Sequence, residues 1–236
     1  MPLLSDFMLF DLHVHSYYSR DSANKPSLLL KIAQKKGIGF AITDHNSTKG
    51  WEEYKKENLN YNVPLVFGEE IKIYKNGAML GELLAYFLQE EVQAGEAESV
   101  LDSLKAQDAI ISIAHPFDWL RPPLFGSKDR FDFLKEHVHA VECFNSRCYT
   151  GRPNKNAQRF ADENMLAVTA GSDAHFPAEF GNALVENDAN SLEEFRKRFS
   201  KNRISPLSRL SPKIYHLYTK CIKSGWMKKE DFFKEP

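Results

Sequence analysis

Short apolar runs of strand length alternate with amphipathic stretches of helix length over most of the chain. The expected strands cover residues 7–12, 39–43, 63–70, 83–87, 109–114, 140–144 and 167–170. The expected helices cover residues 27–36, 47–56, 97–106, 130–136, 153–163 and 192–199. Strands and helices in alternation indicate parallel strands joined by right-handed crossovers. The pattern therefore predicts an α/β protein that is either a closed barrel or an open doubly wound sheet.

Two segments depart from this alternation. Residues 71–81 interrupt it, and the pair Asn76-Gly77 within them favours a hairpin turn. Beyond about residue 200 the chain is basic and is punctuated by Pro206 and Pro212. We therefore expect one domain over residues 1–200 and a short helical extension over residues 201–236.

Charge divides the chain in the same way. Residues 196–236 contain 12 Lys or Arg and 3 Asp or Glu, whereas the whole chain carries 31 and 32. Apolar residues from Ile214 to Ile222 recur at helical spacing, which favours an amphipathic helix packed on the domain. The competing interpretation is a basic arm that captures phosphate-rich substrates.

Composition excludes several classes of protein. Of 236 residues, 42% are hydrophobic, which excludes a disordered chain. No apolar run approaches the roughly 18 residues of a membrane helix, and the first residues lack the basic start of a secretory signal. Three cysteines fit neither a disulfide framework nor a zinc knuckle. We expect a cytoplasmic protein that does not span a membrane.

Histidines and carboxylates follow nearly every expected strand. In parallel α/β folds the carboxyl ends of the strands form the active-site face. The residues at these positions are His13, His15, Asp21, Asp44, His45, Glu69, Glu70, Glu82, His115, Glu142, Asn145, Asp173 and His175.

The spacing of these residues suits metal binding. In His13-x-His15 both imidazoles point to the same side of a strand, so both can reach one ion. A second pair, His137-x-His139, is not accompanied by other candidate ligands in the sequence, and we interpret it as a surface turn. Imidazole mixed with carboxylate, without thiolate, suits Zn, Mn or Fe. Nine candidate ligands are enough for two or three divalent ions, the arrangement used to hydrolyse phosphoesters.

The ordered motifs DLHVHSYYSRDS, ITDHN, GEE, GELLAYF, AHPF, VECFN and GSDAH resemble the polymerase and histidinol phosphatase (PHP) superfamily. The resemblance spans residues 9 to about 185. It implies a distorted (β/α)7 barrel with a trinuclear metal centre. The implied ligand sets are His13, His15, Glu70 and Asp173 for one ion, Glu70, Glu82 and His115 for another, and Asp21, His45 and His175 for the third.

Two of these assignments need a reason. Glu70, and not Glu69, lies at the position that matches the superfamily's Gly-x-Glu spacing. Glu82 stands where many members carry a histidine, which makes the implied second site richer in oxygen.

Several other polar residues are candidates for the same site. Arg147 and Asn145 follow the sixth strand, where a donor to phosphate is useful, and Arg20 ranks below them as a substrate contact. Glu142 is either an outer ligand or a group that positions a ligand. Asp44 either orients a ligand imidazole or caps the next helix.

These residues favour a metal-dependent phosphoesterase. A metal-bridging hydroxide would attack a phosphomonoester of a small molecule or nucleotide, with Asp21, His45, His175 and Arg147 assisting. A nuclease acting on oligonucleotide ends is the main alternative, and a non-catalytic regulatory domain is another. An amidohydrolase barrel also begins with His-x-His, but it does not predict His45 after the second strand or Glu70 after the third. The sequence leaves the oligomeric state open.

Overall fold

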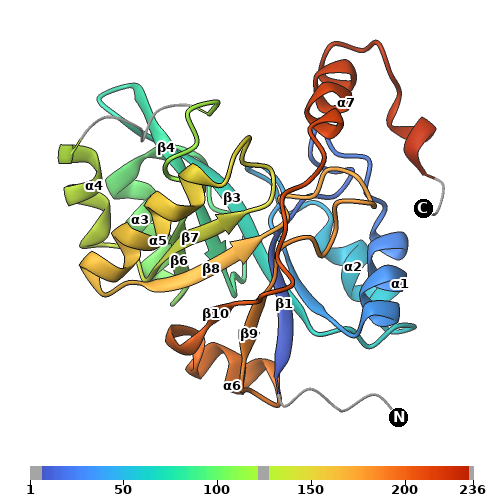
Figure 1. Cartoon of the computed structure of the whole chain (residues 1–236), viewed down its shortest axis with the longest axis horizontal. Helices are drawn as coiled ribbons and strands as arrows, with labels where there is room; N and C mark the ends of the chain where they lie inside the picture. The colour runs from blue at the N-terminus through green and yellow to red at the C-terminus, as the bar shows by residue number, and fades with distance from the viewer. Residues whose placement is uncertain (1–6, 122–127, 234–236) are drawn as a thin grey trace.

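The computed structural model describes residues 7–121 and 128–233, and a strongly curved sheet lies at its centre (Figure 1). Ten strands of the described residues join in this sheet. The strands are β1 Met8–Val14, β2 Gly39–Ile42, β3 Leu65–Lys75, β4 Ala78–Tyr86, β5 Gly95–Glu96, β6 Ile110–Ile113, β7 Ala140–Asn145, β8 Ala167–Gly171, β9 Val185–Asn187 and β10 Arg203–Ile204. All seven expected strands form, although β3 and β4 are longer than expected.

The sheet is mostly parallel but contains one reversed strand. The order along the main path is β10-β9-β1-β2-β3-β4-β6-β7-β8, and β5 pairs with β3. Strand β4 runs antiparallel to both β3 and β6, an exception to the parallel arrangement that agrees with the expected hairpin turn. The cause is the expected hairpin at Asn76-Gly77, where φ values of 54° and 74° give the left-handed pair that a tight turn requires. Because of this reversal, the early part of β4 lies at the carboxyl ends of its neighbours.

The sheet is nearly closed into a barrel, as the resemblance implies. The segment after β8 meets the end of β1, where Asp173 N donates to His13 O at 2.7 Å and His15 N donates to Ala174 O at 3.1 Å. This approach requires a glycine at position 171, since a Cβ there would lie 2.1 Å from the Cβ of His13. The two ends of the sheet thus bring the first and last candidate ligands together.

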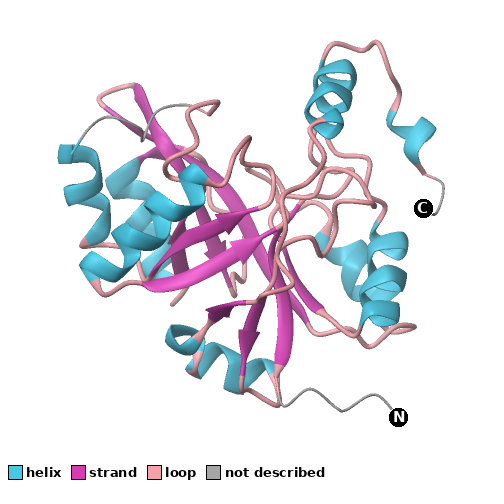
Figure 2. Cartoon of the chain, in the orientation of Figure 1, coloured by secondary structure: helices cyan, strands magenta, loops and turns pink. Residues whose placement is uncertain are grey.

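Helices cover the outside of the barrel (Figure 2). In Figure 1, α1 and α2 lie on one side of the sheet and α3, α4 and α5 lie on the other. The helices are α1 Pro26–Lys36, α2 Trp51–Asn58, α3 Ala97–Ala106, α4 Lys128–Lys135, α5 Arg152–Asn164, α6 Leu192–Lys197 and α7 Ile214–Lys223, with short 3₁₀ turns at Phe199–Lys201 and Lys229–Phe232. None of the helices in the described part of the chain combines the length and apolarity that a bilayer crossing requires.

The C-terminal extension returns along the barrel and ends at its ligand-bearing face. Strands β9 and β10 pair beside β1, and α7 lies at the end of the molecule opposite α6 (Figure 1). Ile222 of α7 is buried against Ala23 and Phe176, with the rings of Tyr215, Tyr218 and Phe232 packed around them. The extension is therefore part of the folded body and stands beside the site described next.

Candidate metal centre

All nine candidate ligands lie at one end of the barrel, at or just beyond the carboxyl ends of its parallel strands. Eight of them are buried, and the side chain of His45 is 22% exposed. The backbones of His115 and Asp173 have φ values of 27° and 53°, a strained region for side chains of this size. Such strain is typical of positions where the fold holds a functional group in place.

The first group combines the end of β1 with Glu70 of β3 and Asp173 after β8. The Nε2 atoms of His13 and His15 are 3.1 Å apart. Glu70 Oε1 lies 3.4 Å from His13 Nε2, and Asp173 Oδ1 lies 3.2 Å from His15 Nε2. Ligand atoms bound to one tetrahedral ion at 2.0–2.1 Å are themselves about 3.3 Å apart, so these spacings suit such an ion.

The second and third groups adjoin the first. His115 Nε2 lies 2.9 Å from Glu70 Oε1 and 3.6 Å from Glu82 Oε2. Asp21 lies 3.6 Å from His45 Nε2 and 3.3 Å from His175 Nε2. His45 Nδ1 is also 2.6 Å from Glu70 Oε2, a contact that the sequence did not predict. Glu70 therefore touches all three groups.

Among the described residues, several carboxylate oxygens of this cluster have no partner in hydrogen-bonding geometry. The atoms are both carboxylate oxygens of Asp21, Oε2 of Glu70 and Oδ1 of Asp173. They lie within ion-pair distance of histidine nitrogens but not in hydrogen-bonding geometry, and Asp21 Oδ2 also lies 2.7 Å from Lys223 Nζ. Buried carboxylates without donors are costly unless a cation is bound. Their donor set, imidazole and carboxylate, fits divalent ions such as Zn, Mn or Fe.

The charges in the cluster also suit cation binding. Burial raises the pKa of Asp173, but Arg121 and His13 outweigh burial and hold it well below its usual range. The pKa of Glu70 is likewise lowered by His13 and His45 against the effect of burial. Both carboxyls are therefore ionised at neutral pH, as a ligand must be.

The neighbours Glu69 and Glu70 face opposite sides of β3, as strand alternation requires. Glu69 accepts a hydrogen bond from Val92 N at 3.1 Å and contacts none of the candidate ligands in the described structure. Burial raises the pKa of Glu69 from 4.5 to about 8. Glu70 is the member of the pair that reaches the cluster.

The buried Glu69 makes stability depend on pH. Because its folded-state pKa is raised, its contribution to stability is present below pH 4.5 and is lost as pH rises through 8. We expect Glu69→Gln to remove about 4 kcal/mol of the decline in unfolding free energy between pH 5 and pH 9. Urea unfolding of both proteins at the two pH values measures this difference. Parallel pH profiles would contradict the assignment.

Glu142 on β7 holds the first histidine in place. Its Oε1 is 2.9 Å from Nδ1 of His13, and its Oε2 accepts from His115 N at 2.7 Å and from Asn145 Nδ2 at 3.1 Å. This geometry leaves the Nε2 atom of His13 facing the cluster. Of the two roles considered for Glu142, the positioning of a ligand is the one that its contacts favour.

We expect Glu142→Gln to weaken metal binding about 10- to 100-fold, as is typical for groups that orient a ligand. An amide has one acceptor oxygen in place of two, so His13, His115 and Asn145 cannot all keep their contacts. Titration of chelator-treated protein with Mn²⁺ measures the affinity. Glu136→Gln, an exposed residue, is the matched control. Equal affinities in the two variants would contradict this role.

Asp44 contacts the site through Ser19. It accepts hydrogen bonds from Ser16 Oγ and Ser19 Oγ, both at 2.5 Å. The Ser19 hydroxyl lies 3.3 Å from His15 Nδ1 and accepts from His45 N at 3.1 Å. Asp44 thus helps to orient two candidate ligands, which the sequence suggested without identifying the serines.

Arg121 is a member of the cluster that the sequence did not identify. It forms an ion pair with Asp173, and its Nη1 lies 3.4 Å from His115 Nε2. It also lies 3.6 Å from Asp118. The one feature of the sequence that could have indicated Arg121 is its position six residues after His115, in the loop that leaves β6. A lone arginine in a long loop gives no reason to choose it over others.

The three predicted substrate contacts, Arg147, Asn145 and Arg20, lie in three different environments. Arg147 is buried and donates to Thr219 Oγ1 at 2.8 Å and to Tyr215 O at 3.1 Å. Asn145 donates to Glu142 and to Asp173 Oδ2 at 3.2 Å. Arg20 is exposed at the cavity rim. Their roles as substrate contacts stay predictions.

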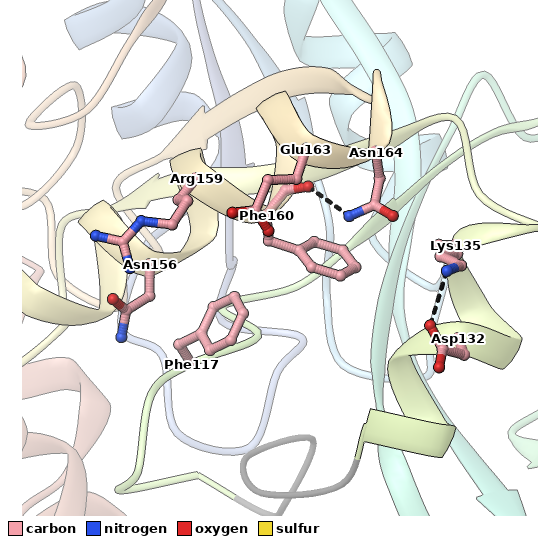
Figure 3. Close-up of a pocket in the computed structure, with 8 residues that line it drawn as sticks. All are labelled: Phe117, Asp132, Lys135, Asn156, Arg159, Phe160, Glu163 and Asn164. Carbon is pink, nitrogen blue, oxygen red and sulfur yellow. Dashed lines mark hydrogen bonds and ion pairs between the residues drawn. The ribbon is translucent and has the colours of Figure 1, made fainter.

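Two cavities adjoin the barrel. One, of about 1100 Å³, includes Asp21, His45, Glu82 and His175 in its wall. The other, of about 550 Å³, lies between α4, α5 and the segment after β6 (Figure 3). The described residues that line this second cavity include no histidine, and Lys135 there pairs with Asp132 at 2.7 Å. The first cavity is therefore the one that gives access to the candidate metal ligands.

Comparison with known proteins identifies a family that matches most of the chain. The PHP domain family model matches residues 11–205. An uncharacterized protein of Methanocaldococcus jannaschii is 35% identical over 223 residues, which cover 93% of this chain and 87% of that protein.

Two solved structures share the fold. A two-domain protein from Bacteroides vulgatus, which contains a predicted PHP-like metal-dependent phosphoesterase, superposes with a TM-score of 0.70 at 18% identity, over 86% of this chain and 66% of that one. An amidohydrolase from Chromobacterium violaceum with bound sulfate superposes with a TM-score of 0.60 at 13% identity, over 89% and 96%. At these identities the likeness concerns the fold alone.

Proposed function

This chain belongs to the PHP domain family, and we propose that it is a metal-dependent hydrolase of phosphomonoesters, with small molecules or nucleotides as substrates. The observation that carries the proposal is the buried cluster of histidines and carboxylates, in which four carboxylate oxygens of the described residues have no partner in hydrogen-bonding geometry. It lies within the part of the chain that the family matches.

In this proposal the three groups each hold one divalent ion. The ligand sets are His13, His15, Glu70 and Asp173; Glu70, Glu82 and His115; and Asp21, His45 and His175. When bound, such ions lower the pKa of a water that serves as nucleophile and neutralise the oxygens of the phosphate. Glu70, which contacts members of every group, would belong to the first two of these ligand sets.

The remaining side chains prepare the site for a phosphate. Glu142 holds the ring of His13, and Ser19, which is bonded to Asp44, contacts the ring of His15, so little reorganisation is needed when substrate binds. Arg121 places a permanent positive charge beside Asp173, where its planar donors suit phosphate oxygens. Asp21, His45 and His175 border the cavity, and one of them, or a water held beside them, would protonate or stabilise the leaving oxygen.

Hydrolysis assays with two kinds of substrate test this function. We expect protein loaded with Mn²⁺, Zn²⁺ or Fe²⁺ to release phosphate from nucleoside monophosphates faster than it shortens an oligonucleotide. Faster cleavage of the oligonucleotide would favour the nuclease alternative. No release of phosphate from a panel of phosphomonoesters with any of these ions would contradict the proposal.

A further inference from the structure

Helix α7 is fixed against the candidate metal centre by polar contacts as well as by apolar packing. Arg147 donates to Thr219 and to the backbone oxygen of Tyr215, and its Nε lies 3.4 Å from Glu179. Glu179 in turn accepts from His175 N at 3.1 Å. A continuous set of contacts therefore links the backbone of a candidate ligand to α7.

One face of α7 borders the same cavity as the candidate ligands. His216, Thr219, Lys220 and Lys223 recur at intervals of three and four residues, which places them on one side of the helix. They share the cavity wall with Asp21, His45 and His175. At about 1100 Å³, this cavity exceeds what a phosphate alone needs and has the size of a small-molecule site.

The ammonium group of Lys223 points into the cluster. Its Nζ lies 2.7 Å from Asp21 Oδ2, and that carboxylate lies 3.3 Å from His175. Two further bonds hold the segments around it, since Lys229 Nζ donates to Tyr17 O at 2.7 Å and Arg20 donates to Lys223 O. Lys223 is thus an inward-facing cation, although more than half of its side chain remains exposed.

We propose that Lys223 binds the phosphate of the substrate, so that α7 completes the active site. The inference rests on the proposed function. Asp21 is a candidate metal ligand, and a divalent ion there neutralises the carboxylate that now attracts the ammonium group. Lys223 has a flexible side chain that lines the cavity. Once Asp21 is neutralised, a phosphate bound beside the ions is the anion that its ammonium group can contact. Lys223 lies outside residues 11–205, so the family match alone does not assign it.

Phosphate binding to Mn²⁺-loaded protein tests this inference without requiring turnover. Isothermal titration with inorganic phosphate should show Kd raised at least about tenfold in Lys223→Met, the loss expected for one charge-assisted contact. The metal content should not change. Lys223→Arg should recover part of the affinity, because it keeps the charge.

Lys213→Met is the matched control. Lys213 immediately precedes α7, and its Nζ lies 3.9 Å from the ring centre of Tyr149. Its removal changes the net charge equally and should leave the Kd for phosphate unchanged. Circular dichroism melts of each variant check that α7 remains docked.

Two results would overturn the inference. Unchanged phosphate affinity in Lys223→Met would mean that the lysine only neutralises Asp21. Loss of metal in that variant would mean that it supports the ligand and does not bind substrate. Failure of the wild-type protein to hydrolyse any phosphomonoester would contradict the proposed function instead, and the titration with phosphate would still give its own answer.

Discussion

Glu70→Gln should lose metal and at least about 100-fold in phosphoesterase rate, more than the loss typical of groups that only orient a ligand. The reason is the central position of the Glu70 carboxylate. Its oxygens lie 3.4 Å from His13 Nε2, 2.6 Å from His45 Nδ1 and 2.9 Å from His115 Nε2. An amide brings no negative charge to this point. Metal content by mass spectrometry and the initial rate of phosphate release measure the two losses.

Glu69→Gln is the control, because it makes the same chemical change one residue away. Its side chain lies on the opposite face of β3 and bonds to Val92. It should retain both metal and rate at neutral pH. Retained metal in Glu70→Gln, or equal losses in the two variants, would contradict the ligand assignment.

Removal of the ions should lower thermal stability substantially. Asp21, Glu70 and Asp173 are buried carboxylates in one cluster, and their mutual repulsion is relieved when cations bind. An ion at 1,000 times its Kd stabilises the folded state by about 4 kcal/mol, or roughly 10 °C in Tm for a chain of this size. Thermal melts of chelator-treated protein with and without Mn²⁺ measure the shift.

Asp173→Asn should abolish most of that shift, because Asp173 Oδ1 lies 3.2 Å from His15 Nε2. His139→Ala should keep it in full. His139 accepts a hydrogen bond from Ile111 N, just before β7 and away from the ligand-bearing strand ends. A shift in Asp173→Asn as large as in the wild type would place the ions elsewhere.

The alternation of apolar and polar segments was sufficient to predict the barrel strands and most helices. It failed on direction at β4, because periodicity locates a strand without stating which way it runs. The Asn76-Gly77 turn held that information. Helix α2 begins at Trp51, later than expected, because residues 47–50 form an irregular turn in place of the first helical turn.

The proximity of the candidate ligands was predictable because most of them lie at or near the ends of strands, which meet at one end of the barrel. The contacts that depend on tertiary structure could not be predicted from the sequence. Arg121 and its partner Asp173 are 52 residues apart in the sequence, and Lys223 and its partner Asp21 are about 200 residues apart. A single arginine or lysine carries no periodic signal, so only the folded chain identifies its partner.

Phosphate release from a nucleoside monophosphate is the most direct measurement of the central claim, that this cluster of residues binds metal ions and hydrolyses phosphomonoesters. The wild-type protein should be assayed after metal loading, after chelation and after reloading, beside Glu70→Gln. The account predicts activity that is lost on chelation, restored by Mn²⁺, Zn²⁺ or Fe²⁺, and absent from the variant throughout. Hydrolysis that survives complete removal of metal, or that Glu70→Gln retains, would contradict it.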